Sequence, residues 1–448
     1  NIDMSGRKMK KMAPPPILEN EPLLSTRKAI DAVKDDEETG AIGHVARFAK
    51  RRLSLFLVLC ACIFAFAIAA FSPRRAHRKP GFEQATGPYK LVELQEGESF
   101  FDHYSFYVGA DSIGSAGFNE YISKDRAEEI GILNITTEET TTEDGNSARD
   151  SFVYMSSKPT NDGPRESIRL EGKQFYDYGL FIIDLRHVPA GCGVWPAFWL
   201  TNEEGWPKKG EIDIVEGINL QSAAKTALHT TNECTMYAHV PQWKKTGTWD
   251  YATGIPNSFS GEPDFKTWKE ADDCWVLAAH QWANQGCVAV SRDEGTLGIP
   301  FNKGGGGVYA LEWDPANRHI RSWAFAPHNT VPTNLLEAIQ TASKGSDRVM
   351  PDTSLWGLPY GYFAIGKDTG CRADHFQDMR LVINLAFCGS VSGNRFFGDC
   401  PNESQNFNVD NNAVLSCNSW IESNPKELEE AYWKIKGVYV YQREIEQA

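Results

Sequence analysis

The stretch WPKKGEIDIVEGINLQ (residues 206–221) alternates isoleucines with acidic residues and predicts a β-strand. Its three carboxylates are Glu211, Asp213 and Glu216. Side chains alternate between the two faces of a strand, so Glu211 and Asp213 point the same way, whereas regular alternation would turn Glu216 away. A β-bulge at Ile214–Val215 adds one residue and returns Glu216 to the acidic face. Because three acids are costly in a core, this face is predicted to line a solvated cleft with a chemical task.

Two carboxylic acids that flank a bond, one nucleophilic and one protonated, are what retaining glycoside hydrolysis requires. In such enzymes the two carboxyl groups lie about 5–5.5 Å apart, and two long glutamates on a curved strand can lean together to reach that separation. Asp213 stands between Glu211 and Glu216, where it could bond one carboxyl and hold the pKa values of the two apart. The alternative is an exposed strand whose acidic face is simply solvated.

The remainder of the chain predicts one large all-β domain over residues 89–448. Of the 448 residues, 41% are hydrophobic and 12% are aromatic, enough for a large core. Short β-rich runs such as SFVYM, YGLFIIDLRHV and KGVYVYQ are separated by Gly, Pro and Asn, a pattern typical of a sandwich or barrel. One short helix is expected at about 334–341, and a further turn near 425–431. The 13 Trp and 15 Tyr are either buried or available for sugar stacking, which composition does not separate.

The N-terminal region predicts a membrane anchor. LSLFLVLCACIFAFAIAAF (residues 53–71) has no charged residue in 19 positions and would span roughly 28 Å as a helix, close to the bilayer core. It is longer than a signal-peptide core, so we expect an uncleaved transmembrane signal anchor. Residues 1–52 are predicted to be a disordered tail and residues 72–88 a stem.

Basic residues flank this segment on both sides, so charge alone does not orient it. Eight of the ten cysteines follow the segment, as do the glycosylation sequons at Asn134 and Asn402, and both features are typical of an oxidising compartment. We therefore expect a single-pass type II membrane protein with a cytosolic tail and an extracellular or lumenal catalytic domain. Residues 1–52 hold 11 basic and 8 acidic residues, and the rest hold 34 and 51. The net negative charge of residues 53–448 argues against a nucleic-acid partner.

Other motifs predict no cofactor and no metal site. Gly304–Gly307 lacks the Lys-Ser/Thr and the following helix of a phosphate-binding loop, so a turn between elements is expected. The cysteine spacings are irregular and contain no zinc-type pair. Eight cysteines allow 105 disulfide pairings. Among these a bridge from Cys274 to Cys287 is the one that short spacing favours.

The segment GCGVWPAFWLTNEEGWPKKGEIDIVEG resembles the signature of glycoside hydrolase family 16, in its laminarinase-like branch. LHTTNEC, FNKGGGGVYALEWD, LVINLAFCG and EAYWKIKGVYVYQ are similar to fungal-type members, over roughly residues 89–443. The bulged spacing is the form of endo-β-1,3-glucanases, whereas lichenases and xyloglucan transglycosylases have a regular E-x-D-x-E. The resemblance implies a concanavalin-like β-jelly-roll sandwich of two antiparallel sheets with a concave substrate cleft.

The resemblance also implies roles for single residues. Glu211 would be the nucleophile, Asp213 its electrostatic helper and Glu216 the general acid/base. The substrate-binding candidates have alternatives that stay open, since Trp195 could as well be a core residue, His229 a structural histidine and Arg169 a member of a salt bridge. The complete set of substrate-binding candidates is Trp195, Trp199, Trp206, His229 and Arg169.

The expected activity is that of an endo-β-1,3-glucanase, or 1,3;1,4-β-glucanase, acting on β-glucan by double displacement. The alternatives are a β-glucan transglycosylase in cell-wall assembly and a non-catalytic glucan-binding protein. The membrane anchor resembles that of family members that act in wall assembly. One departure concerns Cys388-Gly389-Ser390-Val391, because members often continue this run with Asp-Trp. A cleft-edge aromatic is therefore expected to be missing.

Overall fold

The computed structural model describes residues 85–111, 115–141, 147–161, 163–252, 269–346 and 348–444. The chain divides into residues 1–77 and 78–448, and the description below concerns the second unit. The predicted tail (1–52), the membrane segment (53–71) and most of the stem lie outside the described residues. Within the described ranges, no helix combines the length and apolar character needed to cross a bilayer.

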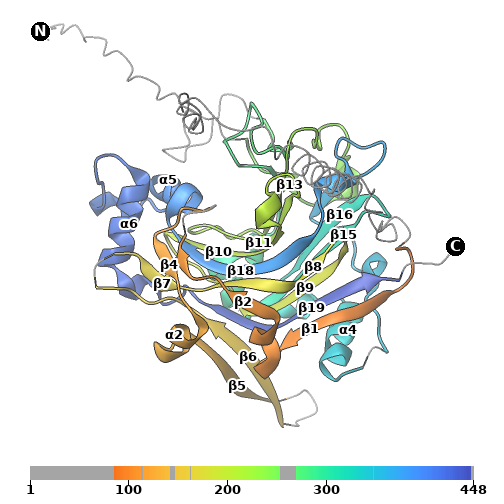
Figure 1. Cartoon of the computed structure of the whole chain (residues 1–448), viewed down its shortest axis with the longest axis horizontal. Helices are drawn as coiled ribbons and strands as arrows, with labels where there is room; N and C mark the ends of the chain where they lie inside the picture. Colours follow the sequence, from red (N-terminus) through yellow and green to blue (C-terminus); the bar gives the residue numbers. More distant parts are fainter. Residues whose placement is uncertain are drawn as a thin grey trace, which may run out of the picture. The chain divides into compact units, whose positions relative to one another are not determined.

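Two eight-stranded antiparallel sheets form the body of the domain (Figure 1). The first, called the cleft sheet, has the strand order β13-β14-β12-β11-β10-β18-β8-β2. The second, called the outer sheet, has the order β17-β16-β15-β9-β19-β6-β5, with β1 also paired to β19. The predicted all-β sandwich of two antiparallel sheets is therefore confirmed. A small third sheet, β3-β4-β7, contains a parallel pair, β4 with β7.

The strands of the cleft sheet are β2 Tyr104–Phe106, β8 Arg169–Tyr176, β10 Val194–Thr201, β11 Glu211–Glu216, β12 Lys225–His229, β13 Thr248–Trp249, β14 Cys287–Val290 and β18 Met379–Phe387. Those of the outer sheet are β1 Tyr89–Glu96, β5 Leu133–Thr141, β6 Ser147–Met155, β9 Gly179–His187, β15 Gly307–Asp314, β16 His319–Phe325, β17 Gly361–Ala364 and β19 Trp433–Arg443. The third sheet comprises β3 Gly109–Ala110, β4 Asn119–Tyr121 and β7 Arg165–Ser167.

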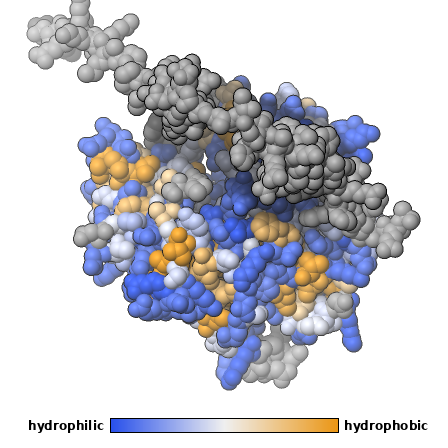
Figure 2. Space-filling view, in the orientation of Figure 1, coloured by the Kyte–Doolittle hydropathy of each residue, from blue (hydrophilic) through white to orange (hydrophobic). Residues whose placement is uncertain are grey.

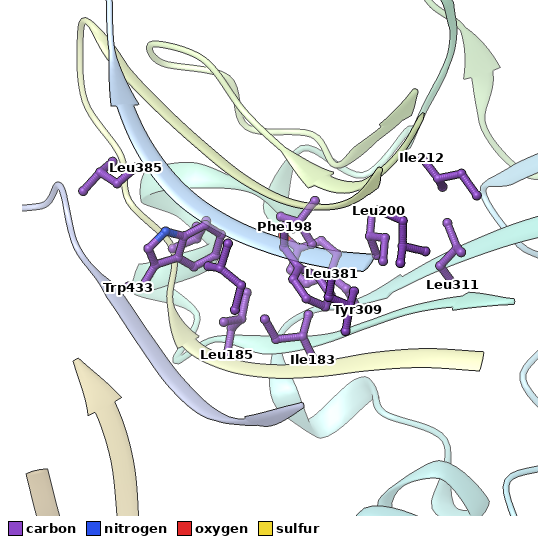
Figure 3. Close-up of a cluster of buried hydrophobic side chains, with 14 of the residues drawn as sticks. Ile183, Leu185, Phe198, Leu200, Ile212, Tyr309, Leu311, Leu381, Leu385 and Trp433 are labelled. Carbon is purple, nitrogen blue, oxygen red and sulfur yellow. The ribbon is translucent and has the colours of Figure 1, made fainter. Parts of the chain in front are cut away.

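The core lies between the two large sheets, where alternate side chains of facing strands meet. Figure 3 shows Phe198 and Leu200 of β10 approaching Ile183 and Leu185 of β9, and all four are fully buried. Trp199, between Phe198 and Leu200 on β10, points to the opposite face and lines the cleft. The period-2 pattern of each strand thus separates the core from the face that carries polar chemistry. On the face of the molecule seen in Figure 2, hydrophilic side chains predominate and hydrophobic ones form small separate groups.

The predicted bulge in β11 is present. Phe198 of β10 pairs with Val215 and Trp199 pairs with Asp213, so Ile214 has no counterpart on β10. The register between β11 and β12 shifts at the same place. Ile214 and Val215 are both buried in the core cluster. The extra residue therefore restores the acidic face beyond the bulge, as the sequence predicted.

Helices lie at the periphery of the sandwich (Figure 1). The expected helix is α4, which packs Leu335 and Ile339 on the outer sheet, and a 3-10 turn occupies Pro425–Leu428 near the second expected position. The prediction of a single helix is wrong. In α6, buried residues fall at 413, 416, 417, 420 and 421, a helical period that the sequence did contain. The helix bounds are α2 Lys124–Glu129, α3 Gly298–Lys303, α4 Thr333–Ser343, α5 Phe396–Asp399 and α6 Ala413–Ser423.

The eight cysteines after residue 85 form four disulfides. Cys274–Cys287 confirms the pairing that short spacing favoured. Cys388–Cys417 ties α6 to the end of β18, and Cys192–Cys400 ties α5 to the start of β10. The fourth bridge joins Cys234 to Cys371. Cys388 follows β18 by one residue, and Cys192 precedes β10 by two residues. Both bridges therefore attach helical segments to central strands of the cleft sheet.

Candidate active site

A cleft of about 640 Å³ runs across the cleft sheet, with β11 near its middle. Side chains from strands on both sides of β11 form its floor. On the β10, β18 and β8 side they are Trp195, Ala197, Trp199, Asn384 and Arg169; on the β12 and β14 side they are Lys225, Ala227, His229 and Val288. The cleft therefore continues past the acidic strand in both directions.

Glu211, Asp213 and Glu216 all line this cleft. Asp213 is almost fully buried, whereas Glu211 and Glu216 keep part of their surface exposed. All three emerge on one face because Glu211 and Asp213 are two residues apart and the bulge shifts Glu216 back. The structure thus brings the three acids together as the spacing predicted.

Burial gives Glu211 and Asp213 unusual protonation. Burial is the largest cause that raises the pKa of Glu211, to about 8, and the negative charges of Asp213 and Glu216 add to the shift. The charge of His229 and a side-chain hydrogen bond with Trp206 act in the opposite direction. Burial, and then the charge of Glu216, raise the pKa of Asp213 well above its usual range. Glu211 and Asp213 therefore do not both ionise in neutral solution, and at least one of them keeps a proton.

His229 is the basic residue beside the acids. It stands opposite Glu211 in the β11–β12 register, and its Nε2 lies 3.1 Å from Asp213 Oδ2 and 3.8 Å from Glu211 Oε1. These three donors are close enough to one another to share a cation. Two carboxylates and one imidazole would suit several divalent ions. The prediction that the protein uses no metal stays a prediction.

Trp195 contacts the third acid. Its Nε1–H donates a hydrogen bond of 2.8 Å to Glu216 Oε1. Trp195 is 8% exposed and packs with Ile218, Ala386 and Val391. The structure thus places Trp195 both in the cleft lining and in a small apolar cluster, so both sequence alternatives describe part of its setting.

Trp199 is fixed by residues that the sequence did not single out. Its Nε1–H donates to Asn384 Oδ1 at 2.8 Å, and Asn384 Nδ2 donates to the Tyr121 hydroxyl at 3.2 Å. Tyr121 in turn lies 3.4 Å from Asp111 Oδ2. Tyr121 is fully buried, and Asn384 and Asp111 are nearly so. An isolated Asn in the apolar run LVINLAF was the one available signal for Asn384.

Arg169 makes the salt bridges that stood as its alternative, and it also lines the cleft. Its Nε is 3.0 Å from Glu171 Oε1, and its Nη2 is 3.4 Å from Glu203 Oε1. The guanidinium also lies over the ring of Trp199, 5.2 Å from its centroid. Arg380 bonds both of the same glutamates. This charge network fixes one end of the cleft floor.

Trp206 follows β10 and is 40% exposed at the cleft, so its ring is available to a ligand. The sequence missed the aromatics on the other side of β11, Tyr251 and Trp282, which also line the cleft. No local pattern marked them, because both lie in irregular segments. Val391 lies in the cleft where an aromatic is often found in the family that the sequence resembles.

The two sequon asparagines, Asn134 on β5 and Asn402 after α5, are both exposed. Their positions are compatible with attached glycans, and glycosylation itself stays a prediction.

Two glutamates with a third acid between them, in a cleft on an antiparallel sheet, are an arrangement found in glycosidases that use two carboxyl groups. A family model described as XgeA-like, catalytic GH16 domain, matches residues 104–441. A probable endo-1,3(4)-beta-glucanase of Aspergillus fumigatus is 33% identical over 356 residues, which are 79% of this chain and 45% of that protein. The endo-1,3(4)-beta-glucanase xgeA of Emericella nidulans is 33% identical over 372 residues, 81% and 49% of the two chains.

Two solved structures are also similar. An elongating GH family 16 beta-1,3-glucosyltransferase has a TM-score of 0.59 and 30% identity, over 79% of this chain and 99% of that one. Laminarinase 16A from Phanerochaete chrysosporium, with beta-glucans in both donor and acceptor sites, has a TM-score of 0.60 and 28% identity over the same shares. The chain therefore belongs to glycoside hydrolase family 16 and carries the catalytic domain of an XgeA-like member. It spans about half the length of the curated fungal relatives it matches.

Proposed function

We propose that this chain is a retaining endo-β-glucanase that cleaves β-1,3-linked glucan, with mixed 1,3;1,4-glucan as a related substrate. The observation that carries the proposal is the convergence of Glu211, Asp213 and Glu216 on one face of β11, in the middle of the cleft. Relatives named as endo-1,3(4)-beta-glucanases support the substrate class. A chain that only bound glucan would gain nothing from burying three acids together.

In the first step, a Glu211 carboxylate oxygen attacks the anomeric carbon of the sugar. The bond from that carbon to the glycosidic oxygen breaks, and Glu216 gives its proton to the departing oxygen. The product is an ester between the sugar and Glu211. In the second step, Glu216 takes a proton from water, the hydroxide oxygen attacks the anomeric carbon, and Glu211 leaves as a carboxylate. Two displacements at one carbon retain its configuration.

The proposed reaction requires the acids to share one proton. The raised pKa of Glu211, about 8, means that the group of acids still holds a proton in neutral solution. Double displacement requires the proton on Glu216 and the charge on Glu211, so Glu211 must give up the proton that its raised pKa favours. His229, 3.8 Å from Glu211, and the hydrogen bond with Trp206 both favour charge on Glu211. Asp213, held 3.1 Å from His229, separates the two glutamates along the strand.

The extent of the cleft supports internal cleavage. Trp199 and Arg169 lie on one side of β11, and Val288 and Trp282 line the cleft on the other. Sugars on both sides of the scissile bond would therefore contact protein. Exposed aromatic rings such as Trp206 offer apolar faces for pyranose rings, and the charged and amide groups of Arg169 and Asn384 can bond hydroxyls.

The test is to incubate the purified chain and its Glu211→Gln variant with linear β-1,3-glucan, mixed-linkage glucan and β-1,6-glucan, and to size the products. We expect short β-1,3 oligosaccharides from the wild type and none from the variant. Glucan binding without turnover by both forms would leave a binding protein and overturn the proposal.

A second candidate function is transfer of the glycosyl group to another glucan instead of water. The cleft continues on both sides of β11, which leaves room for an acceptor sugar beside the donor. The similar structure named as an elongating beta-1,3-glucosyltransferase supports this candidate. The same two glutamates serve both outcomes, so the size of the products decides between them. Products longer than the donor would assign the chain to transfer.

We further propose that residues 53–71 anchor the protein in a membrane as a type II protein, with the catalytic domain extracellular or lumenal. The apolar segment, the four disulfides and the exposed sequons at Asn134 and Asn402 support this topology. Digestion of intact vesicles with protease should remove the tail and spare the glycosylated domain. Removal of the domain instead would reverse the orientation.

A further inference from the structure

We propose that Trp195 is a positioning residue for the general acid/base, holding Glu216 through its indole N–H, and that it is not a platform for sugar stacking. The inference rests on the proposed function and deepens it. It explains why a tryptophan on the cleft floor is almost buried, and it assigns a task to a hydrogen bond that the fold alone does not require.

The register of the sheet brings the two side chains together. Ala197 of β10 pairs with Glu216, and Trp195 is two residues from Ala197 on the same face. Trp195 is therefore a diagonal neighbour of Glu216, at a separation that a long side chain can bridge. The bulge at 214–215 is required for this meeting, because without it Glu216 would point into the core.

Packing holds the indole in place. Trp195 is 8% exposed, and its ring lies in a cluster with Ile218, Ala386 and Val391. Little of the ring is left for a pyranose. Trp199, four residues along β10, provides a contrast: its Nε1–H bonds Asn384, and its ring lies beside Arg169 on the cleft floor. The two tryptophans face the same cleft but their N–H groups bond different partners.

The chemistry of the donor decides what the bond does. An indole N–H can only donate, so Glu216 Oε1 must accept, whether Glu216 is protonated or not. Because a carbonyl oxygen accepts better than a hydroxyl oxygen, this bond favours the proton of the acid form on Oε2. When that proton moves to the glycosidic oxygen, the N–H stabilises the negative charge that Glu216 acquires. Trp195 should therefore accelerate the first displacement most for substrates whose leaving group needs a proton.

Dependence on the leaving group gives the test. Trp195→Phe removes the N–H and keeps an aromatic ring, and Trp199→Phe is the matched control. The full chain and both variants are assayed on laminarioligosaccharides, whose leaving group needs protonation, and on a 2,4-dinitrophenyl β-laminaribioside, whose leaving group does not. The constant kcat/KM is compared because it reports the first displacement, and thermal unfolding checks that each variant is folded.

For Trp195→Phe we expect kcat/KM to fall about 10- to 100-fold on the oligosaccharide and less than about 3-fold on the aryl glycoside, with KM little changed. Trp199→Phe should lose similar factors on both substrates, because it changes the cleft floor and not the acid. Equal losses on both substrates for Trp195→Phe, or no loss on either, would overturn the proposal. If the wild type cleaves neither substrate, the proposed function itself fails, which is a different result.

Discussion

Two groups of residues in this fold contain the same elements, an E-x-D pair on a strand and a nearby histidine. On β11 they are Glu211, Asp213 and His229; on the outer sheet they are Glu312, Asp314 and His319. In both groups, one ligand atom from each residue lies within 4.8 Å of the others. The difference between the groups lies in what surrounds the glutamate.

Glu312 is fully buried and fully bonded. It accepts hydrogen bonds from Tyr89 at 2.7 Å and Thr353 at 3.0 Å, and it contacts His319 at 2.8 Å. Arg321 and Arg443 pair with it as well. Burial acts to raise the pKa of Glu312, but the hydrogen bond of His319 and the charge of Arg321 outweigh it and hold the pKa well below its ordinary value.

In the described part of the chain, the charges that act most on Glu211 are those of Asp213, Glu216 and His229. No arginine is among them. Its pKa is raised to about 8. The comparison shows that the cations around a carboxyl, more than its depth of burial, decide whether it serves the fold or remains available for chemistry. Glu312 is held ionised in a completed network, whereas Glu211 faces a cleft without an arginine to hold it ionised.

The largest expected effect is on turnover. Glu211→Gln removes the proposed nucleophile and should lower kcat at least about 10⁴-fold, whereas Glu312→Gln should leave kcat of the folded fraction within about 3-fold. Initial rates on β-1,3-glucan, corrected for the folded fraction by circular dichroism, measure both. A Glu312→Gln variant that folds normally but loses turnover would break the comparison.

Stability should respond in the opposite order. Glu312→Gln leaves Arg321 and Arg443 facing a neutral amide in a buried site, and should reduce the free energy of unfolding by about 3–5 kcal/mol. Glu211→Gln relieves repulsion among the acids and should leave the fold equally stable or more stable at pH 7. Urea denaturation of the wild type and the two variants gives the values. A strongly destabilised Glu211→Gln variant would contradict the account of the cleft.

The dependence of stability on pH should also differ. The pKa of Glu211 rises from 4.5 to about 8 on folding, so the folded chain binds this proton more tightly than the unfolded chain. The contribution of Glu211 to the free energy of unfolding therefore falls as pH rises between those two values. The loss should be on the order of 2 kcal/mol, less than the whole shift implies because the acids share protons. Glu312 has a depressed pKa, so its contribution is present above pH 4.5 and is lost as pH falls.

Unfolding free energies at pH 5 and pH 8 separate these contributions. Relative to the wild type, Glu211→Gln should lose less stability between pH 5 and pH 8. An unchanged slope in that variant would mean that Glu211 titrates normally in the folded chain.

The smallest effect concerns metal ions. Both groups have donors spaced for a cation, but the proposed attack requires Glu211 to be free, and Glu312 is already neutralised by arginines. Dialysis against EDTA should therefore leave both kcat and the unfolding midpoint unchanged, with added Ca²⁺ as the control. A loss of activity that Ca²⁺ restores would show that the β11 group works as a cation site.

What the sequence could predict follows from the range of each interaction. Strand alternation and the bulge at Ile214–Val215 depend on a few adjacent residues, so the acidic face of β11 was predictable. Cys274–Cys287 was predictable for the same reason, since only 13 positions separate the two. Helix α6 had a readable period, and its omission was an error of interpretation.

The partners of the site residues were not predictable, because they are distant in sequence. Asn384 bonds Trp199 across 185 positions, and Arg380 reaches Glu203 across 177. The pattern E-x-D at Glu312 is locally the same as that at Glu211, and the arginines that distinguish it come from other strands. The motif thus identifies candidates, and the packing of strands decides which candidate is left without an arginine partner.

The most direct test of the account is to trap the covalent intermediate. The chain would be incubated with 2,4-dinitrophenyl 2-deoxy-2-fluoro-β-laminaribioside, digested, and its peptides analysed by mass spectrometry. The account predicts a single fluoroglycosyl ester on Glu211, accompanied by loss of activity. A label on Glu216 or Asp213, or release of the leaving group with no label on any of the three, would contradict the assignment of Glu211 as the nucleophile.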